Sequence, residues 1–171
     1  MQQTKNKALG HFKSALQIYP PFYNAAFDIG RTYSTLNMPD SAIVYFQRAI
    51  AINPKNSDAH VIVARLLGER NRLTETIPYY EYRLKNVPTD YPAYEALSFV
   101  HYSLKDYKKS LAVNALAVKQ FPSMPDPLVN IGKTYAPMNK LDSARHYIQR
   151  ALAISPNNPK IIEFLQQVGG K

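Results

Sequence analysis

The chain has 171 residues, a hydrophobic content of 46% and a formal net charge of +9. It contains no cysteine, which excludes disulfides, thiolate metal sites and cysteine nucleophiles. No segment approaches the roughly 18–20 uninterrupted apolar residues that a bilayer-crossing helix needs, so we expect no direct membrane insertion.

The positive charge has two interpretations. It indicates affinity for an acidic partner, which would be a peptide, a nucleic acid or an anionic membrane surface, or it serves only solubility. The basic residues are scattered, and their longest run is the Lys108-Lys109 pair. Because the chain also lacks the aromatic and basic signature of a nucleic-acid module, we favour solubility and expect no nucleic-acid partner.

Evenly spaced prolines divide the chain into segments of equal length. They recur every 34 residues, at Pro20, Pro54, Pro88, Pro122 and Pro156. A fixed period of this size indicates stacked supersecondary units, each of which contacts only its neighbours.

Residues 1–22 fit the second helix of a repeat whose first helix is missing. Ala8, Phe12 and Ala15 follow the i, i+4, i+7 spacing that places side chains on one helical face. We therefore expect the native polypeptide, of bacterial type, to continue upstream. An apolar end of this kind also favours pairing with a second copy, so a homo-oligomer formed through the terminal repeat is a further possibility.

The first complete repeat, residues 23–56, carries small and large apolar side chains in a definite order: Ala26, Ile29, Gly30, Tyr33, Ala42, Phe46, Ala49 and Pro54. Gly30 and Ala42 are small enough for two antiparallel helices to approach closely, while Tyr33 and Phe46 fill the space beside them. This succession resembles the tetratricopeptide repeat family, whose pattern is W-x2-L-G-x2-Y…A-x3-F…P, over nearly the whole chain.

The resemblance implies an all-α fold, a right-handed superhelical solenoid of antiparallel helix pairs with about ten helices. Residues 1–171 would form a single array. Its parts would be the half repeat 1–22, full repeats at 23–56, 57–90, 91–124 and 125–158, and a capping helix at 159–171.

Residues 57–90 keep the repeat length but depart from the pattern, and we expect this repeat to be the least regular. Thr76 replaces the alanine, and Pro78 would either cost a backbone hydrogen bond or displace the start of the helix. Arg83 stands where Ala49 stands in the first repeat. It must reach outward to water or find a carboxylate, and we expect the former.

The third and fourth repeats add two further expectations. His101 and Asn114 occupy paired core positions, which predicts a side-chain hydrogen bond across the helix pair. In the fourth repeat, Pro137 should end or kink the first helix early.

Reactive side chains do not gather in any pattern typical of catalysis. The four histidines show no i, i+3 or i+4 pair, and no zinc-protease, phosphate-loop or serine-hydrolase motif is present. His60 and His101 take inward positions, and His11 and His146 lie on outer helices. We therefore predict that the chain is not an enzyme and holds no cofactor or metal.

The family resemblance implies that the first helix of each pair lines a concave groove. There, Arg31, Arg65 and Lys133 share one repeat position, with apolar side chains beside them. This predicts a groove that binds a peptide or protein segment, with apolar anchors and an acidic group. The candidate groove residues are Phe27, Arg31, Val61, Ile62, Arg65, Phe99, Tyr102, Val129, Asn130 and Lys133.

Three other readings stay open. Some of these side chains could pack between neighbouring helices instead of binding a partner. The chain could be an accessory or regulatory region of a larger enzyme or sensor protein, or a self-assembly module. The family's clamp for carboxyl termini is absent. When the clamp is aligned from the first repeat, its positions hold Phe27, Arg31, Ile62, Pro92 and Ala96, and when it is aligned from the second repeat the clamp residues are missing as well.

Overall fold

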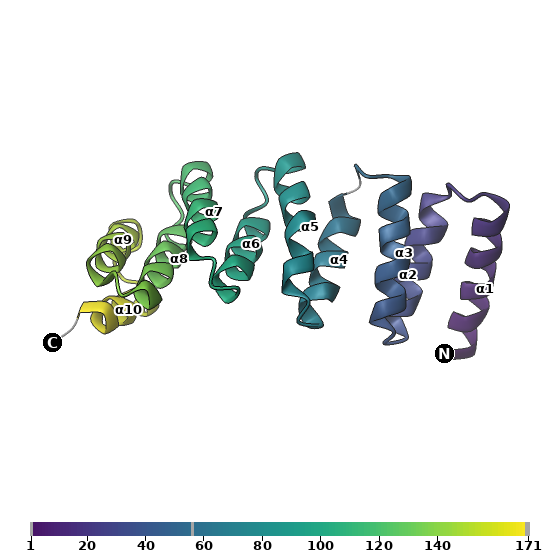
Figure 1. Cartoon of the computed structure of the whole chain (residues 1–171), viewed down its shortest axis with the longest axis horizontal. Helices are drawn as coiled ribbons and strands as arrows, with labels where there is room; N and C mark the ends of the chain where they lie inside the picture. Colours follow the sequence, from purple (N-terminus) through teal and green to yellow (C-terminus); the bar gives the residue numbers. More distant parts are fainter. Residues whose placement is uncertain (1, 56, 170–171) are drawn as a thin grey trace. The chain divides into compact units, whose positions relative to one another are not determined.

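The computed structural model describes residues 2–55 and 57–169, and within these residues every regular element is a helix (Figure 1). The predicted all-α class is therefore confirmed. Predicted segments 1–22, 23–56 and 159–171 each include positions outside the described residues. The chain divides into two compact units, Met1–Val87 and Pro88–Lys171, which we call the N-terminal and C-terminal units.

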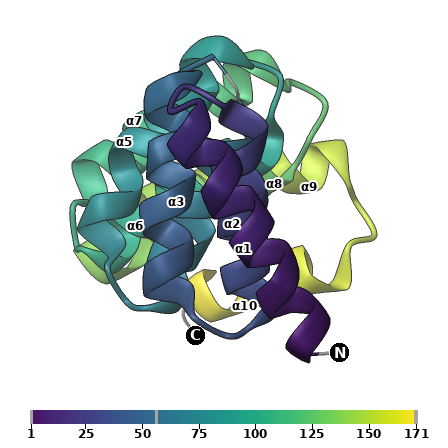
Figure 2. The ribbon, with the colours of Figure 1, turned by 90° about the vertical axis from the view of Figure 1, so that its right-hand side faces the viewer.

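In the N-terminal unit, α2 packs against α3 and α4 against α5, while α3 contacts α4 (Figure 1). The first helix packs on α2, as the view along the chain shows (Figure 2). The bounds of these helices are α1 Gln2–Ile18, α2 Tyr23–Thr35, α3 Pro39–Ile52, α4 Ser57–Glu69 and α5 Leu73–Asn86.

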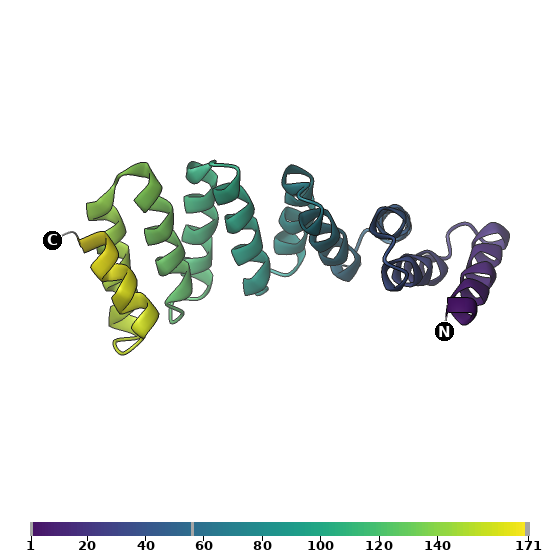
Figure 3. The ribbon, with the colours of Figure 1, turned by 90° about the horizontal axis from the view of Figure 1, so that it is seen from below.

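In the C-terminal unit, α6 packs against α7 and α8 against α9, and α7 contacts α8 (Figure 3). The last helix packs against α9 and buries Ile161 and Val168. That both units belong to one array stays a prediction. The bounds are α6 Tyr91–Ser103, α7 Tyr107–Gln120, α8 Asp126–Tyr135, the 3-10 turn η1 Ala136–Met138, α9 Leu141–Ile154 and α10 Pro159–Gly169.

Glycine allows the paired helices to approach where the repeat pattern predicts it. A Cβ atom on Gly30 would lie 3.0 Å from the Phe46 ring, and one on Gly132 would lie 2.6 Å from Ile148 Cδ1. Ala42 is fully buried beside the first of these contacts. At both positions, the side chain of the paired helix therefore leaves no room for a residue larger than glycine.

The turn within each helix pair has the same backbone conformation in all four repeats. After the end of the first helix, the turn contains a residue with φ between 56° and 59°, and the next residue donates its N–H to a carbonyl five residues back. Such a left-handed residue ends helices commonly, and asparagine tolerates it better than most side chains. The four residues are Asn37, Asn71, Lys105 and Asn139.

Lys105 is the one member of this set that is not asparagine, so Lys105→Asn is expected to stabilise the protein. The short polar side chain of asparagine can hydrogen-bond to the nearby backbone in the left-handed conformation, and the long lysine side chain cannot. The substitution should therefore raise the free energy of unfolding by about 1 kcal/mol. Urea denaturation of the two proteins measures this. Asn37→Lys should lower the free energy by a similar amount, and no change in either variant would contradict the explanation.

Pro78 lies inside α5, which begins at Leu73, in register with the second helices of the other repeats. The helix start is therefore not displaced, and the proline instead removes a backbone donor from the helix interior. Arg83 is only 18% exposed, and its Nη1 lies 3.5 Å from Asp58 Oδ1. The expectation that Arg83 reaches outward to water is thus wrong, because a carboxylate from α4 is within reach.

His60 is buried, as predicted for a core histidine. Its ring stacks on Tyr82, with 3.8 Å between centroids and 7° between planes, and its Nε2 lies 3.1 Å from the Pro54 carbonyl oxygen. Its Nδ1 has no hydrogen-bond partner within residues 2–55 and 57–169. Burial lowers the pKa of His60 below its usual value, and the contact with the Pro54 carbonyl opposes this only in part.

A lowered pKa in the folded state means that the unfolded chain takes up a proton more readily than the folded chain. The stability that neutral His60 contributes is therefore present above about pH 6.5 and is lost as the pH falls below it. His60→Phe should keep the stacked ring and reduce the loss of stability between about pH 7.5 and 5.5. Chemical denaturation at both pH values tests this, with the exposed His146→Gln as the matched control.

Candidate functional site

The ten candidate groove residues fall equally into the two units. Those of the N-terminal unit lie on α2 and α4, and those of the C-terminal unit lie on α6 and α8. The first group is Phe27, Arg31, Val61, Ile62 and Arg65, and the second is Phe99, Tyr102, Val129, Asn130 and Lys133.

In the N-terminal unit, two of the three apolar candidates, Phe27 and Ile62, are engaged in packing, and the third, Val61, is half-buried. Phe27 is half-buried, with its ring centroid 5.2 Å from that of Phe46 in an edge-to-face arrangement and 5.6 Å from that of Tyr23. Ile62 is half-buried against the core around Val63. Packing between helices thus accounts for both Phe27 and Ile62.

The two candidate arginines of this unit are exposed, but each has an acidic neighbour on its own helix. Arg31 Nη1 lies 3.4 Å from Asp28 Oδ1, and Arg65 Nη1 donates a hydrogen bond of 2.6 Å to Glu69 Oε1. Such exposed pairs contribute little to stability, yet they offset much of the positive charge that an acidic partner would meet.

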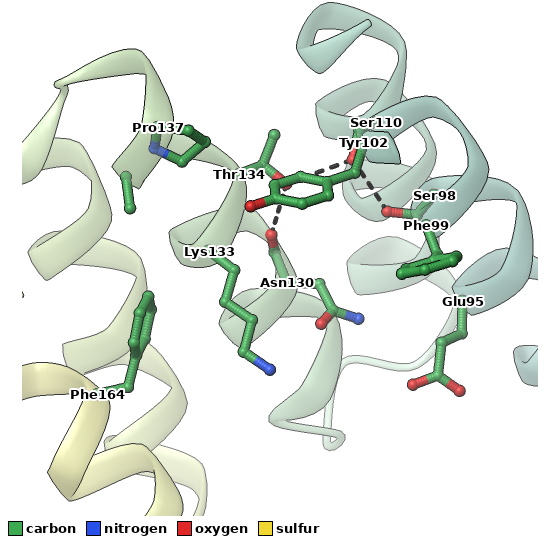
Figure 4. A pocket seen from close by; sticks show the side chains of 11 residues that line it. Glu95, Ser98, Phe99, Tyr102, Ser110, Asn130, Lys133, Thr134, Pro137 and Phe164 are labelled. Carbon is green, nitrogen blue, oxygen red and sulfur yellow. Dashed lines mark hydrogen bonds between the residues drawn. The ribbon is translucent and has the colours of Figure 1, made fainter. Parts of the chain in front are cut away.

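In the C-terminal unit, by contrast, Phe99 is 62% exposed and Tyr102 is exposed on the same helix. Asn130 and Lys133 stand on α8, facing the same pocket. Figure 4 shows Lys133 and Asn130 between Phe99 on one side and Phe164 of α10 on the other. Lys133 has no ion-pair partner among the described residues.

These side chains surround a pocket of about 440 Å³, which we call the aromatic pocket. Four of the five candidates of this unit line it, whereas Val129 packs against the core cluster around Leu128. The lining residues are Glu95, Ser98, Phe99, Tyr102, Ser110, Asn130, Lys133, Thr134, Ala136, Pro137 and Phe164.

The early end of α8 contributes one wall. The helix stops at Tyr135 after 10 residues, whereas α2, α4 and α6 each have 13. Pro137 lies in the 3-10 turn that follows, which confirms that it ends the helix. Ala136 and Pro137 thereby line the aromatic pocket, a role that the repeat pattern did not indicate.

Three buried hydroxyl groups form the base of the pocket, and we call Ser98, Ser110 and Thr134 the hydroxyl base. Ser98 Oγ lies 3.1 Å from Ser110 Oγ, which lies 3.3 Å from Thr134 Oγ1 (Figure 4). The Asn114 amide donates to Ser98 Oγ. Asn114 thus binds across the helix pair as predicted, but its partner is Ser98 rather than His101.

Two members of the hydroxyl base, Ser98 and Ser110, together with Asn114, occupy positions that hold apolar packing residues in the first repeat. In the first repeat the matching positions of Ser98, Ser110 and Asn114 are Gly30, Ala42 and Phe46. In the third repeat a polar network therefore replaces an aromatic side chain set against glycine. Buried polar groups are retained only where they are hydrogen-bonded, and here they are.

The described residues contain no group of three or more His, Asp or Glu side chains placed to hold a metal ion. None of their helices is long and apolar enough to cross a membrane.

Comparison with known proteins gives three kinds of likeness. Residues 23–56 and 125–158 match the tetratricopeptide repeat family. Human tetratricopeptide repeat protein 21B is 27% identical over 146 residues, which are 81% of this chain but 11% of that protein. The chain thus spans about a tenth of this relative's length.

Solved structures resemble the fold at low sequence identity. YrrB, described as a TPR protein with an unusual peptide-binding site, has a TM-score of 0.74 at 20% identity, covering 96% of this chain and 84% of its own. MamA has a TM-score of 0.70 at 18% identity, covering 93% and 95%. A MamA fragment from Desulfovibrio magneticus RS-1 has a TM-score of 0.68 at 17% identity, covering 85% and 82%.

Proposed function

The chain belongs to the tetratricopeptide repeat family, and from this premise we propose that it binds a peptide segment of a partner protein in the aromatic pocket. The fold is that of a protein–protein interaction scaffold. The observation that carries the proposal is the exposure of Phe99, at 62%, within a concave site. An exposed aromatic side chain in a pocket is typical of an interface anchor.

The charge of Lys133 adds a second recognition element. Arg31 and Arg65 are paired on their own helices, whereas Lys133 is not, so Lys133 is the most available of the three candidate cations for an acidic group of the partner, in a pocket that Glu95 also lines. The fold resembles that of YrrB, which is described as having a peptide-binding site, and this supports a peptide as the occupant. The proposed ligand is therefore a segment with an apolar anchor and a nearby carboxylate.

Peptide selection tests the proposal directly. A random peptide library is selected on the full chain and counter-selected on the Phe99→Ala variant, and nuclear magnetic resonance shifts map the bound peptides. We expect peptides whose shifts cluster on α6, α8 and α10. Peptides that bind the variant equally well, or shifts confined to other helices, would remove the proposal.

Self-association is a second candidate, favoured by a separate observation. At the end of α1 and the turn after it, Ile18 is 85% exposed, Tyr19 58% and Phe22 39%. A contiguous apolar surface of this kind is costly in water and is relieved by contact with another copy.

If this surface joins two copies, the dimer fraction must rise with protein concentration. Light scattering over a concentration series should then show an increasing mass for the wild type, and a constant mass for Ile18→Asp. A constant mass for both proteins would exclude self-association through this surface.

A further inference from the structure

The donor direction in the hydroxyl base is fixed by one backbone carbonyl. Thr134 Oγ1 donates its proton to the Asn130 carbonyl oxygen at 2.7 Å. Thr134 can therefore only accept in its contact with Ser110, so Ser110 donates to Thr134. By the same step Ser98 donates to Ser110.

The Asn114 amide completes this chain. Because the Ser98 proton already points to Ser110, Ser98 must accept from Asn114, in agreement with an Nδ2 donor at that position. The direction thus runs from Asn114 through the two serines to Thr134 and ends on the Asn130 carbonyl.

The hydroxyl base consequently offers only acceptors. Each of its three oxygens has given its proton to a neighbour and accepted one hydrogen bond, which leaves one lone pair on each. Ser110 is fully buried, so a ligand group can reach only the small exposed parts of Ser98, at 4%, and Thr134, at 2%, and it must donate there. A group that brings an acceptor there would leave it buried and unpaired, which is unfavourable.

The walls above this base select for an aromatic ligand group. Phe99, Tyr102 and Phe164 contribute rings to the pocket, and Pro137 adds a further apolar surface (Figure 4). Aromatic side chains gain from offset or edge-on contact with such rings in addition to the apolar area that they bury.

Few side chains combine these two properties. Tyrosine, asparagine and glutamine carry acceptors as well as donors, and these acceptors would meet no proton at the base. Lysine and arginine are donors only, but burying their charge against neutral hydroxyl groups is costly, and Glu95, the one carboxylate of the pocket lining, is shared with Lys133. Residues 88–171 also hold ten basic against six acidic side chains. Tryptophan has a large apolar ring system and a single N–H donor.

We propose that the aromatic pocket is a receptor for a tryptophan side chain of the partner, whose indole N–H donates to the hydroxyl base. This inference rests on the proposed function and assigns the anchor residue of its ligand. The rings of Phe99, Tyr102 and Phe164 contact the indole, while Lys133 faces an acidic neighbour in the same peptide.

The chain contains no tryptophan, which makes the test direct. The probe is the acetylated pentapeptide amide Ala-Asp-Trp-Ala-Ala, whose indole emission is observed without background as the full chain is added. A second peptide carries 3-benzothienylalanine, in which sulfur replaces the N–H group at nearly the same shape, and its affinity is measured by competition. Because one hydrogen bond is lost, we expect it to bind about tenfold more weakly.

The variant Ser110→Ala removes the group that accepts the Ser98 proton, so that Ser98 can turn this proton to the ligand and is no longer an acceptor only. It also restores the alanine that the first and fourth repeats have at this position, so it should fold. In this variant the tenfold preference should fall to about twofold or less. Thr76→Ala, the same position in the second repeat, is the matched control and should keep the full preference. Thermal melting checks that both variants are folded.

Equal binding of the two peptides to the wild type, or an unchanged preference in Ser110→Ala, would overturn the inference. Tighter binding of the same pentapeptide with arginine in place of tryptophan, Ala-Asp-Arg-Ala-Ala, would overturn it as well. If both aromatic peptides bind equally and both are lost on Phe99→Ala, the pocket still binds peptides and only the tryptophan assignment fails. The library selection judges the proposed function independently.

Discussion

The double variant Phe99→Ala, Lys133→Glu is expected to bind a peptide selected on the aromatic pocket about a hundredfold more weakly than the wild type, or weaker still. Removing the exposed Phe99 ring deletes the anchor contact, which at interface hot spots costs about 2 kcal/mol. Reversing the charge of Lys133 replaces attraction of a carboxylate by repulsion. Titration calorimetry on the wild type, both single variants and the double variant measures the effect.

The salt dependence separates the two contributions. The part that depends on Lys133 should weaken as ionic strength rises, whereas the part that depends on Phe99 should persist. Arg31→Glu and Arg65→Glu are the matched controls, because each removes an exposed cation that already has an acidic neighbour. An unchanged affinity in the double variant, or an equal loss in the controls, would contradict the pocket as the binding site.

The helix pairs could be predicted from the sequence because their cause is local and repeats. Gly30 and Gly132 are required by the ring of Phe46 and the side chain of Ile148, which stand at the same distance along the chain in both repeats. The effect of Pro137 on α8 is equally local, since a proline removes its own N–H and restricts its neighbour.

The exposure of the candidate residues could not be read from the pattern. Phe27 and Phe99 both belong to the face predicted to line a groove, yet Phe27 packs on Phe46 and Tyr23 while Phe99 is exposed. The difference depends on which side chains the neighbouring helix supplies. In the same way, the pairing of Arg65 with Glu69 depends on the rotamers of both residues.

The hydrogen bonds of the hydroxyl base could be predicted from the sequence only in part. Asn114 stands where other repeats have Phe46 or Ile148, which correctly predicts a polar contact across the helix pair. The sequence pairs Asn114 with His101, whereas the structure gives Ser98 as its partner, one helical turn earlier on α6 and at the position of Gly30. Thr134 enters from the following repeat, and no periodic pattern within one repeat could include it.

Phe46→Ala is expected to cause the largest loss of stability, about 3–5 kcal/mol. The side chain is 1% exposed, its ring contacts Phe27 edge-on, and it fills the space that Gly30 leaves open. Gly30 has no side chain and Ala42 has only a methyl group, so neither can fill the cavity. Urea denaturation followed by circular dichroism measures the loss, and a change below about 1 kcal/mol would contradict this account of the helix contact.

The location of that loss tests whether stability in this chain is local. In repeat proteins each helix pair is stabilised by its own contacts and by those with its direct neighbours. Amide hydrogen exchange of Phe46→Ala should therefore show reduced protection in α2 and α3, and preserved protection in α8 and α9. Ile148→Ala, the matched change in the fourth repeat, should show the reverse, because Ile148 is equally buried against Gly132. A uniform loss of protection in both variants would mean that the two units unfold as one cooperative body, and tetratricopeptide packing would then be less local here than the repeat architecture implies.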